Sequence, residues 1–171
     1  MRGVRGSISI VLVVFAMLLV QSVFSRLLAP YPFAPYLGLP FVFALGTAPG
    51  VGIVRGAATA FAIGYLYDLF TGNPLGIHTL VFVIGLLVAR LVAYLVSFRG
   101  LPFELTLTFF LTLPLGGLLE TIRAFTPGGM AWDGVTLTAA LFGSAFATAI
   151  VAPLLFALTW RIDPQAEGAP T

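Results

Sequence analysis

The chain has 171 residues, of which 60% are hydrophobic and only 8% are charged, with a formal net charge of +2. A soluble domain of average composition has roughly a quarter charged residues, so this composition excludes a water-soluble protein with a single core. The absence of cysteine excludes disulfides and thiolate metal sites, and eight arginines without a basic cluster do not favour a nucleic-acid partner. Apolar runs of about 18 residues or more predict an all-α integral membrane protein.

The first predicted helix follows a basic start. Arg2 and Arg5 precede an uncharged stretch over residues 7–25. A basic start and an apolar run are also typical of a signal peptide, but no small-x-small cleavage site is clear and further hydrophobic segments follow. We therefore expect an uncleaved first membrane helix.

Five further helices are expected after it, joined by short connectors rich in glycine and proline. In the connector over residues 71–74, Gly72 suits the position after a helix, Asn73 an N-cap and Pro74 the first helical residue. Residues 1–163 are expected to form one six-helix transmembrane domain, and residues 164–171 a disordered cytoplasmic tail. The predicted helices are residues 37–48, 56–70, 75–96, 101–122 and 135–160.

The arginines predict the orientation of these helices in the membrane. Five arginines fall at the ends that share a side with the N-terminus, and two fall in the opposite connectors. Because cytoplasmic loops carry an excess of basic residues, both termini are expected in the cytoplasm. The five are Arg2, Arg5, Arg55, Arg99 and Arg161; the two are Arg26 and Arg123.

Two predicted helices carry small residues at a spacing of four, which keeps them on one face. Small residues let a second helix approach closely within lipid. Packing inside the six-helix fold and docking of a partner helix are both open interpretations. The residues are Gly56, Ala60 and Gly64 in the third helix, and Ala140, Gly143, Ser144, Ala147 and Thr148 in the sixth.

Asp68 lies one turn before the end of the third helix, where a carboxylate meets the negative end of its own helix. The carboxylate would be stabilised if it pointed across the turn, at the first N–H groups of the fourth helix near Gly76 or at His78. We therefore expect Asp68 to close a helical hairpin; proton relay or ligand binding through Asp68 and His78 is the alternative.

Three other charges lie within or close to the predicted spans. Arg90 is about two turns from the end of the fourth helix, hence ~10 Å into the bilayer, and needs an acceptor or a route to the interface. Glu104, across the next turn, is the expected ion-pair partner. Glu104 and Glu120 are the two acids of a polar stripe on the fifth helix, which should face protein or water. Structural roles are expected for all three, with a gating or substrate role for Arg90 as the alternative.

No catalytic constellation, cofactor motif or metal-ligand set is apparent. An intramembrane aspartyl protease needs two embedded aspartates, whereas Asp133 and Asp163 lie in connectors. A serine hydrolase needs a base beside a buried serine. The only histidine, His78, lies at the start of the fourth predicted helix, whereas Ser144 lies in the middle of the sixth. We expect a protein that is not an enzyme and that binds neither a cofactor nor a metal.

The segment over residues 56–80 resembles the core signature of the bacterial rod shape-determining protein MreD family. That family has a glycine-containing third helix that ends in an aspartate, followed by a small-polar turn and Pro-Leu-Gly. The segment covers about 25 residues, and the rest of the chain is similar only in its hydropathy and six-span layout. The matching positions are Gly64, Asp68, Gly72, Pro74, Leu75 and Gly76.

The resemblance implies a non-catalytic scaffold in the inner membrane, within the elongation complex that directs side-wall peptidoglycan synthesis and cell shape. The implied partners are MreC through its transmembrane helix and, less directly, MreB, RodA and a transpeptidase, with membrane lipid and a possible second copy of the chain. The implied fold is similar to the membrane substrate-binding subunits of energy-coupling-factor transporters. A vitamin-binding transporter subunit, with a pocket lined by Asp68, His78 and Glu120, is therefore the alternative.

Overall fold

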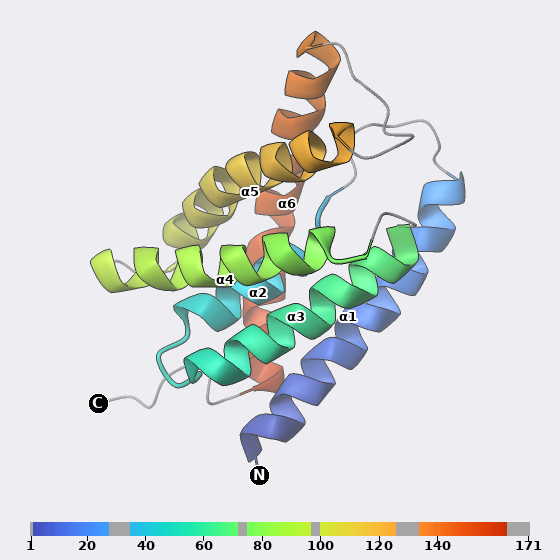
Figure 1. Ribbon diagram of the computed structural model, residues 1–171. Helices are drawn as coiled ribbons and strands as arrows, with labels where there is room; N and C mark the ends of the chain where they lie inside the picture. The colour runs from blue at the N-terminus through green and yellow to red at the C-terminus, as the bar shows by residue number, and fades with distance from the viewer. Residues whose placement is uncertain (1, 28–34, 72–74, 97–99, 126–133, 164–171) are drawn as a thin grey trace.

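The computed structural model describes residues 2–27, 35–71, 75–96, 100–125 and 134–163. Within those ranges the chain forms six α-helices and no strand (Figure 1). The prediction of an all-α chain is confirmed, and each predicted helix is present with its ends shifted by a few residues. The helices are α1 (Arg2–Leu27), α2 (Gly38–Thr47), α3 (Ile53–Thr71), α4 (Ile77–Leu95), α5 (Leu101–Ala124) and α6 (Gly134–Ile162). The expected tail over residues 164–171 lies outside the described residues.

Three helices in the described part of the chain are long and apolar enough to cross a membrane: α4, α5 and α6. They contain 19, 24 and 29 residues, and at 1.5 Å per residue each reaches about 28 Å or more. The hydrocarbon core of a bilayer is about 30 Å thick. The chain therefore has the helices of a membrane protein.

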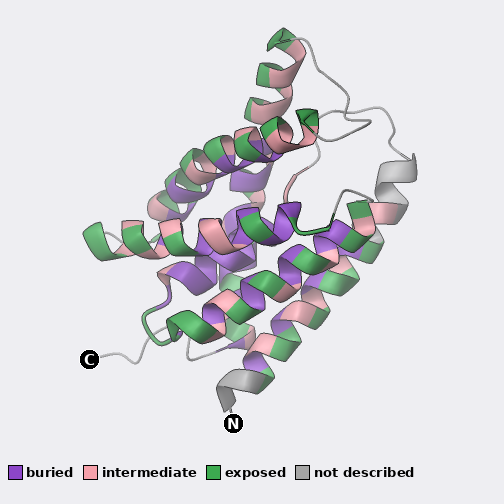
Figure 2. Ribbon diagram, viewed as in Figure 1, coloured by how far each residue is buried: buried purple, intermediate pink, exposed green. Residues whose placement is uncertain are grey.

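α2 is much shorter and lies in the middle of the molecule. Its ten residues span about 15 Å, and all residues from Gly38 to Gly46 are buried (Figure 2). It packs against α3, α4, α5 and α6. A Cβ at Gly46 would lie 2.8 Å from the Leu86 carbonyl oxygen, so the absence of a side chain lets α2 and α4 approach closely. α2 is a core element with no exposed face.

The remaining helices surround α2 in adjacent pairs. α1 packs against α3, α3 against α4, and α5 against α6 (Figure 1). The beginning of α1 meets the end of α6, because a Cβ at Gly6 would lie 2.7 Å from Cγ of Asp163. Asp163 is buried and forms an ion pair with Arg55 at the start of α3. One ion pair thus joins α3 to the end of α6 beside α1.

Large apolar side chains are exposed on every helix except α2, whereas many polar side chains are buried. Val54, Phe110 and Leu154 are at least 63% exposed, while Asp68, His78 and Thr108 are at most 1% exposed. Polar groups in a bilayer turn inward, toward partners or a cavity. This distribution agrees with the composition and places the polar candidates of the sequence inside the helix bundle.

Candidate functional site

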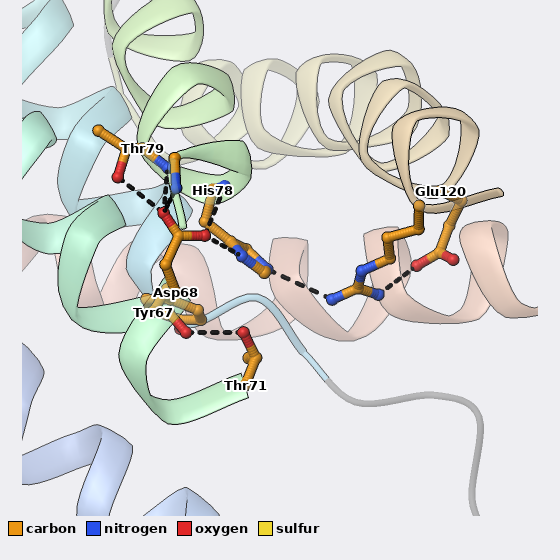
Figure 3. Close-up of polar contacts among 8 residues, drawn as sticks. Tyr67, Asp68, Thr71, His78, Thr79 and Glu120 are labelled. Carbon is orange, nitrogen blue, oxygen red and sulfur yellow. Dashed lines mark hydrogen bonds and ion pairs between the residues drawn. The ribbon is translucent and has the colours of Figure 1, made fainter. Parts of the chain in front are cut away.

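Asp68 joins α3 to the first turn of α4. Its two carboxylate oxygens accept hydrogen bonds from the backbone N–H groups of Gly76, His78 and Thr79 at 2.8, 2.9 and 3.2 Å. They also accept from the Thr79 hydroxyl at 2.8 Å and contact Nδ1 of His78 at 2.9 Å (Figure 3). The first N–H groups of a helix have no acceptor within it, and Asp68 supplies one. The predicted contact across the hairpin is therefore present.

The start of α4 differs from the sequence prediction. Asn73 was expected to cap the helix and Pro74 to be its first residue, but the helix begins at Ile77 after Gly76, which has φ +104°. No side chain of the residue before the helix caps it. Asp68 takes over that role from the preceding helix, so a local cap is not needed. Gly72, Asn73 and Pro74 lie outside the described residues.

The small-residue face of α3 is used within the fold. Gly56, Ala60 and Gly64 are all buried. A Cβ at Gly64 would lie 2.5 Å from Cα of Thr79, and one at Gly56 would lie 3.1 Å from Leu86, so both glycines face α4. Of the two interpretations left open by the sequence, internal packing applies to this face.

A chain of polar contacts leads from Asp68 toward α5. Because a carboxylate only accepts, Nδ1 of His78 carries the hydrogen and Nε2 of the neutral ring presents a lone pair. Nη2 of Arg123 lies 3.4 Å from Nε2, and Nη1 of Arg123 donates to Glu120 at 2.6 Å (Figure 3). The contacts connect residues that are 45 positions apart in the sequence. They tie the end of α5 to the hairpin of α3 and α4.

His78, Glu120 and Arg123 line a cavity of about 270 Å³. The cavity lies where the ends of α3 and α5 meet the beginnings of α4 and α6, with Gln21 of α1 on one side. Its remaining wall is largely apolar. The other lining residues are Pro35, Tyr36, Tyr67, Thr71, Leu137, Ala140, Leu141 and Ser144.

Several polar groups on the residues that line the cavity have hydrogen-bonding capacity that the fold does not use. Nε of Arg123 and Oε1 of Gln21 are buried without a hydrogen-bond partner among the described residues. Burial raises the pKa of the Tyr36 phenol, and the Glu120 carboxylate raises it further. Tyr36 therefore keeps its proton at neutral pH and can donate one hydrogen bond. The cavity thus offers two donors and one acceptor beside a guanidinium–carboxylate pair.

Arg90 and Glu104 do not form the predicted ion pair. The Arg90 guanidinium donates from Nη2 to the backbone carbonyl of Val51, in the connector between α2 and α3. Glu104 is 5% exposed and has no side-chain partner among the described residues. The backbone carbonyl gives the guanidinium one acceptor, while Nη1 of Arg90 is buried without a partner among the described residues. A backbone acceptor has no signature in the sequence.

The polar face of α6 is also turned inward. Ser144 and Thr148 are buried, and the Thr148 hydroxyl accepts a hydrogen bond from the N–H of Tyr36 at 2.9 Å. Ala140 lines the polar cavity. Gly143 and Ala147, which are also four residues apart, are only partly buried. These two small residues therefore lie at the edge of the helix packing.

A second, apolar groove runs between α1 and α3, with a volume of about 420 Å³. Its floor on α3 is formed by the small residues Ala58, Thr59 and Ala62, with Arg55 at one end. The α1 side is formed by Ser7, Ile8, Val11 and Leu12. Ala58 and Ala62 were not predicted as a packing face, although they have the same spacing of four as Gly56, Ala60 and Gly64 on the other face of α3.

No protein-family model, curated protein or solved structure matches this chain.

One ion pair links two residues that the sequence placed only at the ends of helices. This pair, Arg55 with Asp163, joins the start of α3 to the end of α6. No group of three or more metal-ligating side chains occurs among the residues that the structure describes.

Proposed function

We propose that this protein is a non-catalytic membrane scaffold of the bacterial cell-elongation complex, and that it binds the transmembrane helix of MreC. The family resemblance in residues 56–80 supplies the identity of the partner. The observation that carries the proposal is the groove between α1 and α3, which is apolar and has small side chains along its floor.

The groove has the properties that helix association in lipid requires. Helices and lipid tails are equally apolar, so association depends on close packing, which small residues allow. Ala58 is exposed and Ala62 partly exposed, while Ile8 and Leu12 on the opposite wall are 56% and 61% exposed. One apolar helix laid along this groove would cover all four.

The membrane topology proposed with this function has both termini in the cytoplasm and six helices across the bilayer of the inner membrane. The arginine distribution supports it, as does the meeting of α1 and α6 at Gly6 and Asp163. α2 is too short to cross alone; it would cross as the covered centre of the bundle, where its backbone needs no lipid-facing length.

The polar cavity favours this scaffold over a vitamin-binding transporter subunit. Its volume of about 270 Å³ is below the range of about 300–1,000 Å³ that is typical of pockets for drug-sized ligands. Asp68, which the transporter interpretation needs as a ligand contact, already accepts five contacts from its own hairpin.

The test is co-purification with MreC from a mild detergent, using wild type and two phenylalanine variants. Ala58→Phe fills the groove and is expected to reduce MreC retention several-fold. Ala139→Phe adds the same side chain at an exposed position of α6 and is expected to retain MreC. Failure of the wild type to retain MreC would refute the scaffold function. If Ala58→Phe and Ala139→Phe retain MreC equally, the groove between α1 and α3 is not the surface that binds MreC.

A further inference from the structure

The polar cavity contains hydrogen-bonding capacity that the protein does not use. Nε of Arg123 is a buried donor and Oε1 of Gln21 a buried acceptor, and neither has a partner among the described residues. A buried polar group that lacks a hydrogen-bond partner destabilises the structure. An occupant that both accepts from Arg123 and donates to Gln21 would offset this destabilisation.

The charges beside these groups restrict what the occupant can be. Nη1 of Arg123 lies 2.6 Å from Oε1 of Glu120. A simple anion bound to the guanidinium would therefore be repelled by the Glu120 carboxylate. A simple cation on Glu120 would meet the guanidinium. A zwitterion avoids both conflicts, because its acid group can face Arg123 while its ammonium group faces Glu120 and Gln21.

The rest of the wall is consistent with this orientation. The Tyr36 hydroxyl is a further donor for an acid oxygen. Nε2 of His78 faces the Nη2 donor of Arg123 at 3.4 Å, so this nitrogen acts as an acceptor and the ring adds no positive charge. Leu137 and Leu141 of α6 form an apolar side, against which hydrocarbon can lie.

The position and size of the cavity identify the zwitterion more closely. The cavity lies at the ends of α5 and at the beginnings of α4 and α6, the three helices long enough to cross a membrane. The ends of such helices lie at the level of the lipid headgroups. The cavity has a volume of about 270 Å³, below the range of about 300–1,000 Å³ that is typical of pockets for drug-sized ligands. This is enough for a small headgroup and too little for its acyl chains.

We propose that this cavity binds a phosphoethanolamine zwitterion, as the headgroup of an aminophospholipid. The phosphate accepts from Nε of Arg123 and from the Tyr36 hydroxyl. The primary ammonium donates to the Glu120 carboxylate and to Oε1 of Gln21. This site is separate from the groove between α1 and α3 and does not depend on MreC binding.

Native mass spectrometry of the full chain tests the proposal with lipids that share their acyl chains. Dioleoyl phosphatidylethanolamine is compared with the phosphatidylglycerol and phosphatidylcholine analogues. The first lacks the ammonium, and the second has a trimethylammonium that cannot donate a hydrogen bond. Preferential retention of phosphatidylethanolamine over both is expected, and equal retention of the three would overturn the proposal.

Variants locate the binding at this cavity. Arg123→Gln is expected to weaken phosphatidylethanolamine retention by about tenfold or more, because a hydrogen bond to a charged group is lost. Arg161→Gln, at an exposed position of α6, is the charge-matched control. Ala140→Phe fills the cavity and should abolish the preference, whereas Ala139→Phe, one residue away and exposed, should leave it intact. If Arg123→Gln does not fold, the comparison of Ala140→Phe with Ala139→Phe tests the proposal.

Soluble O-phosphoethanolamine distinguishes the source of the headgroup. Its displacement of bound phosphatidylethanolamine, lost in Ala140→Phe, would support the site and place recognition in the headgroup alone. Binding of the soluble compound without lipid binding would keep the zwitterion chemistry and reject the lipid. A phosphatidylethanolamine preference that survives in both Arg123→Gln and Ala140→Phe would overturn the proposal.

Discussion

Gly64 of α3 lies against the backbone of Thr79 in α4, so closely that a Cβ on the glycine would be 2.5 Å from the Thr79 Cα. This approach brings the end of α3 to the start of α4, where Asp68 reaches the N–H groups of His78 and Thr79. The glycine and the aspartate are therefore parts of one device. The absence of a side chain at Gly64 lets the two helices approach closely, and Asp68 can reach the N–H groups of α4 only at this short distance.

Gly64→Ala is expected to destabilise the protein by about 1–3 kcal/mol, because the obstructing atoms belong to backbone and cannot rotate away. Gly117→Ala is the matched control. Gly117 also lies in a helix, but a Cβ there meets nothing within 4 Å, so the change should stabilise by about 0.5–1 kcal/mol. Thermal unfolding in detergent gives both values. A fall in stability at position 117 equal to that at 64 would refute the close-packing explanation.

Asp68→Leu is expected to cost about 1–3 kcal/mol, since three N–H groups at the start of α4 lose their acceptor. Asp68→Asn keeps one acceptor oxygen and should fall between wild type and the leucine variant. Unfolding midpoints in detergent provide the order of the three proteins. Unchanged stability in Asp68→Leu would show that the hydrogen bonds contribute nothing to the hairpin.

Two buried threonines provide a paired test of hydroxyl bonding. Thr148 accepts from the N–H of Tyr36 and donates to the Ser144 carbonyl, so Thr148→Val should cost about 1–3 kcal/mol. The Thr108 hydroxyl is equally buried and has no partner among the described residues. Thr108→Val should therefore change stability by less than about 0.5 kcal/mol or increase it. A larger loss at 108 than at 148 would contradict this assignment.

The ion pair of Arg55 with Asp163 is expected to show energetic coupling. Asp163 is 2% exposed. Arg55→Gln removes the guanidinium from this ion pair, and Asp163→Asn removes the carboxylate charge. The double variant should lose less stability than the sum of the two singles, by about 0.5–3 kcal/mol. Equilibrium unfolding of the four proteins measures the difference. Strict additivity would mean that the contact has no energetic role.

Hydropathy and turn residues predicted the six helices because each feature is local. The Asp68 contact was also predictable, since a carboxylate at the end of its own helix needs donors from elsewhere. The acceptor of Arg90 was not predictable. Arg90 donates to the backbone carbonyl of Val51. Because every residue has a backbone carbonyl, the sequence does not indicate which one Arg90 contacts.

The polar cavity was beyond prediction for a different reason. His78 and Glu120 were both selected from the sequence, but Arg123 was assigned only to a connector. Its contact with His78 depends on how α5 crosses the hairpin of α3 and α4. The complete burial of α2 was hidden as well, because an apolar helix facing protein has the same composition as one facing lipid.

The burial of α2 has a consequence for biogenesis. Its packing partners are α3, α4, α5 and α6, and all of them are synthesised after it. Ten residues span about half of the hydrocarbon core of a bilayer, so α2 is covered only as the helices encoded after it are added. A nascent chain released before α6 would leave one side of α2 uncovered. The burial of α2 is thus complete only when the last helix has packed against it.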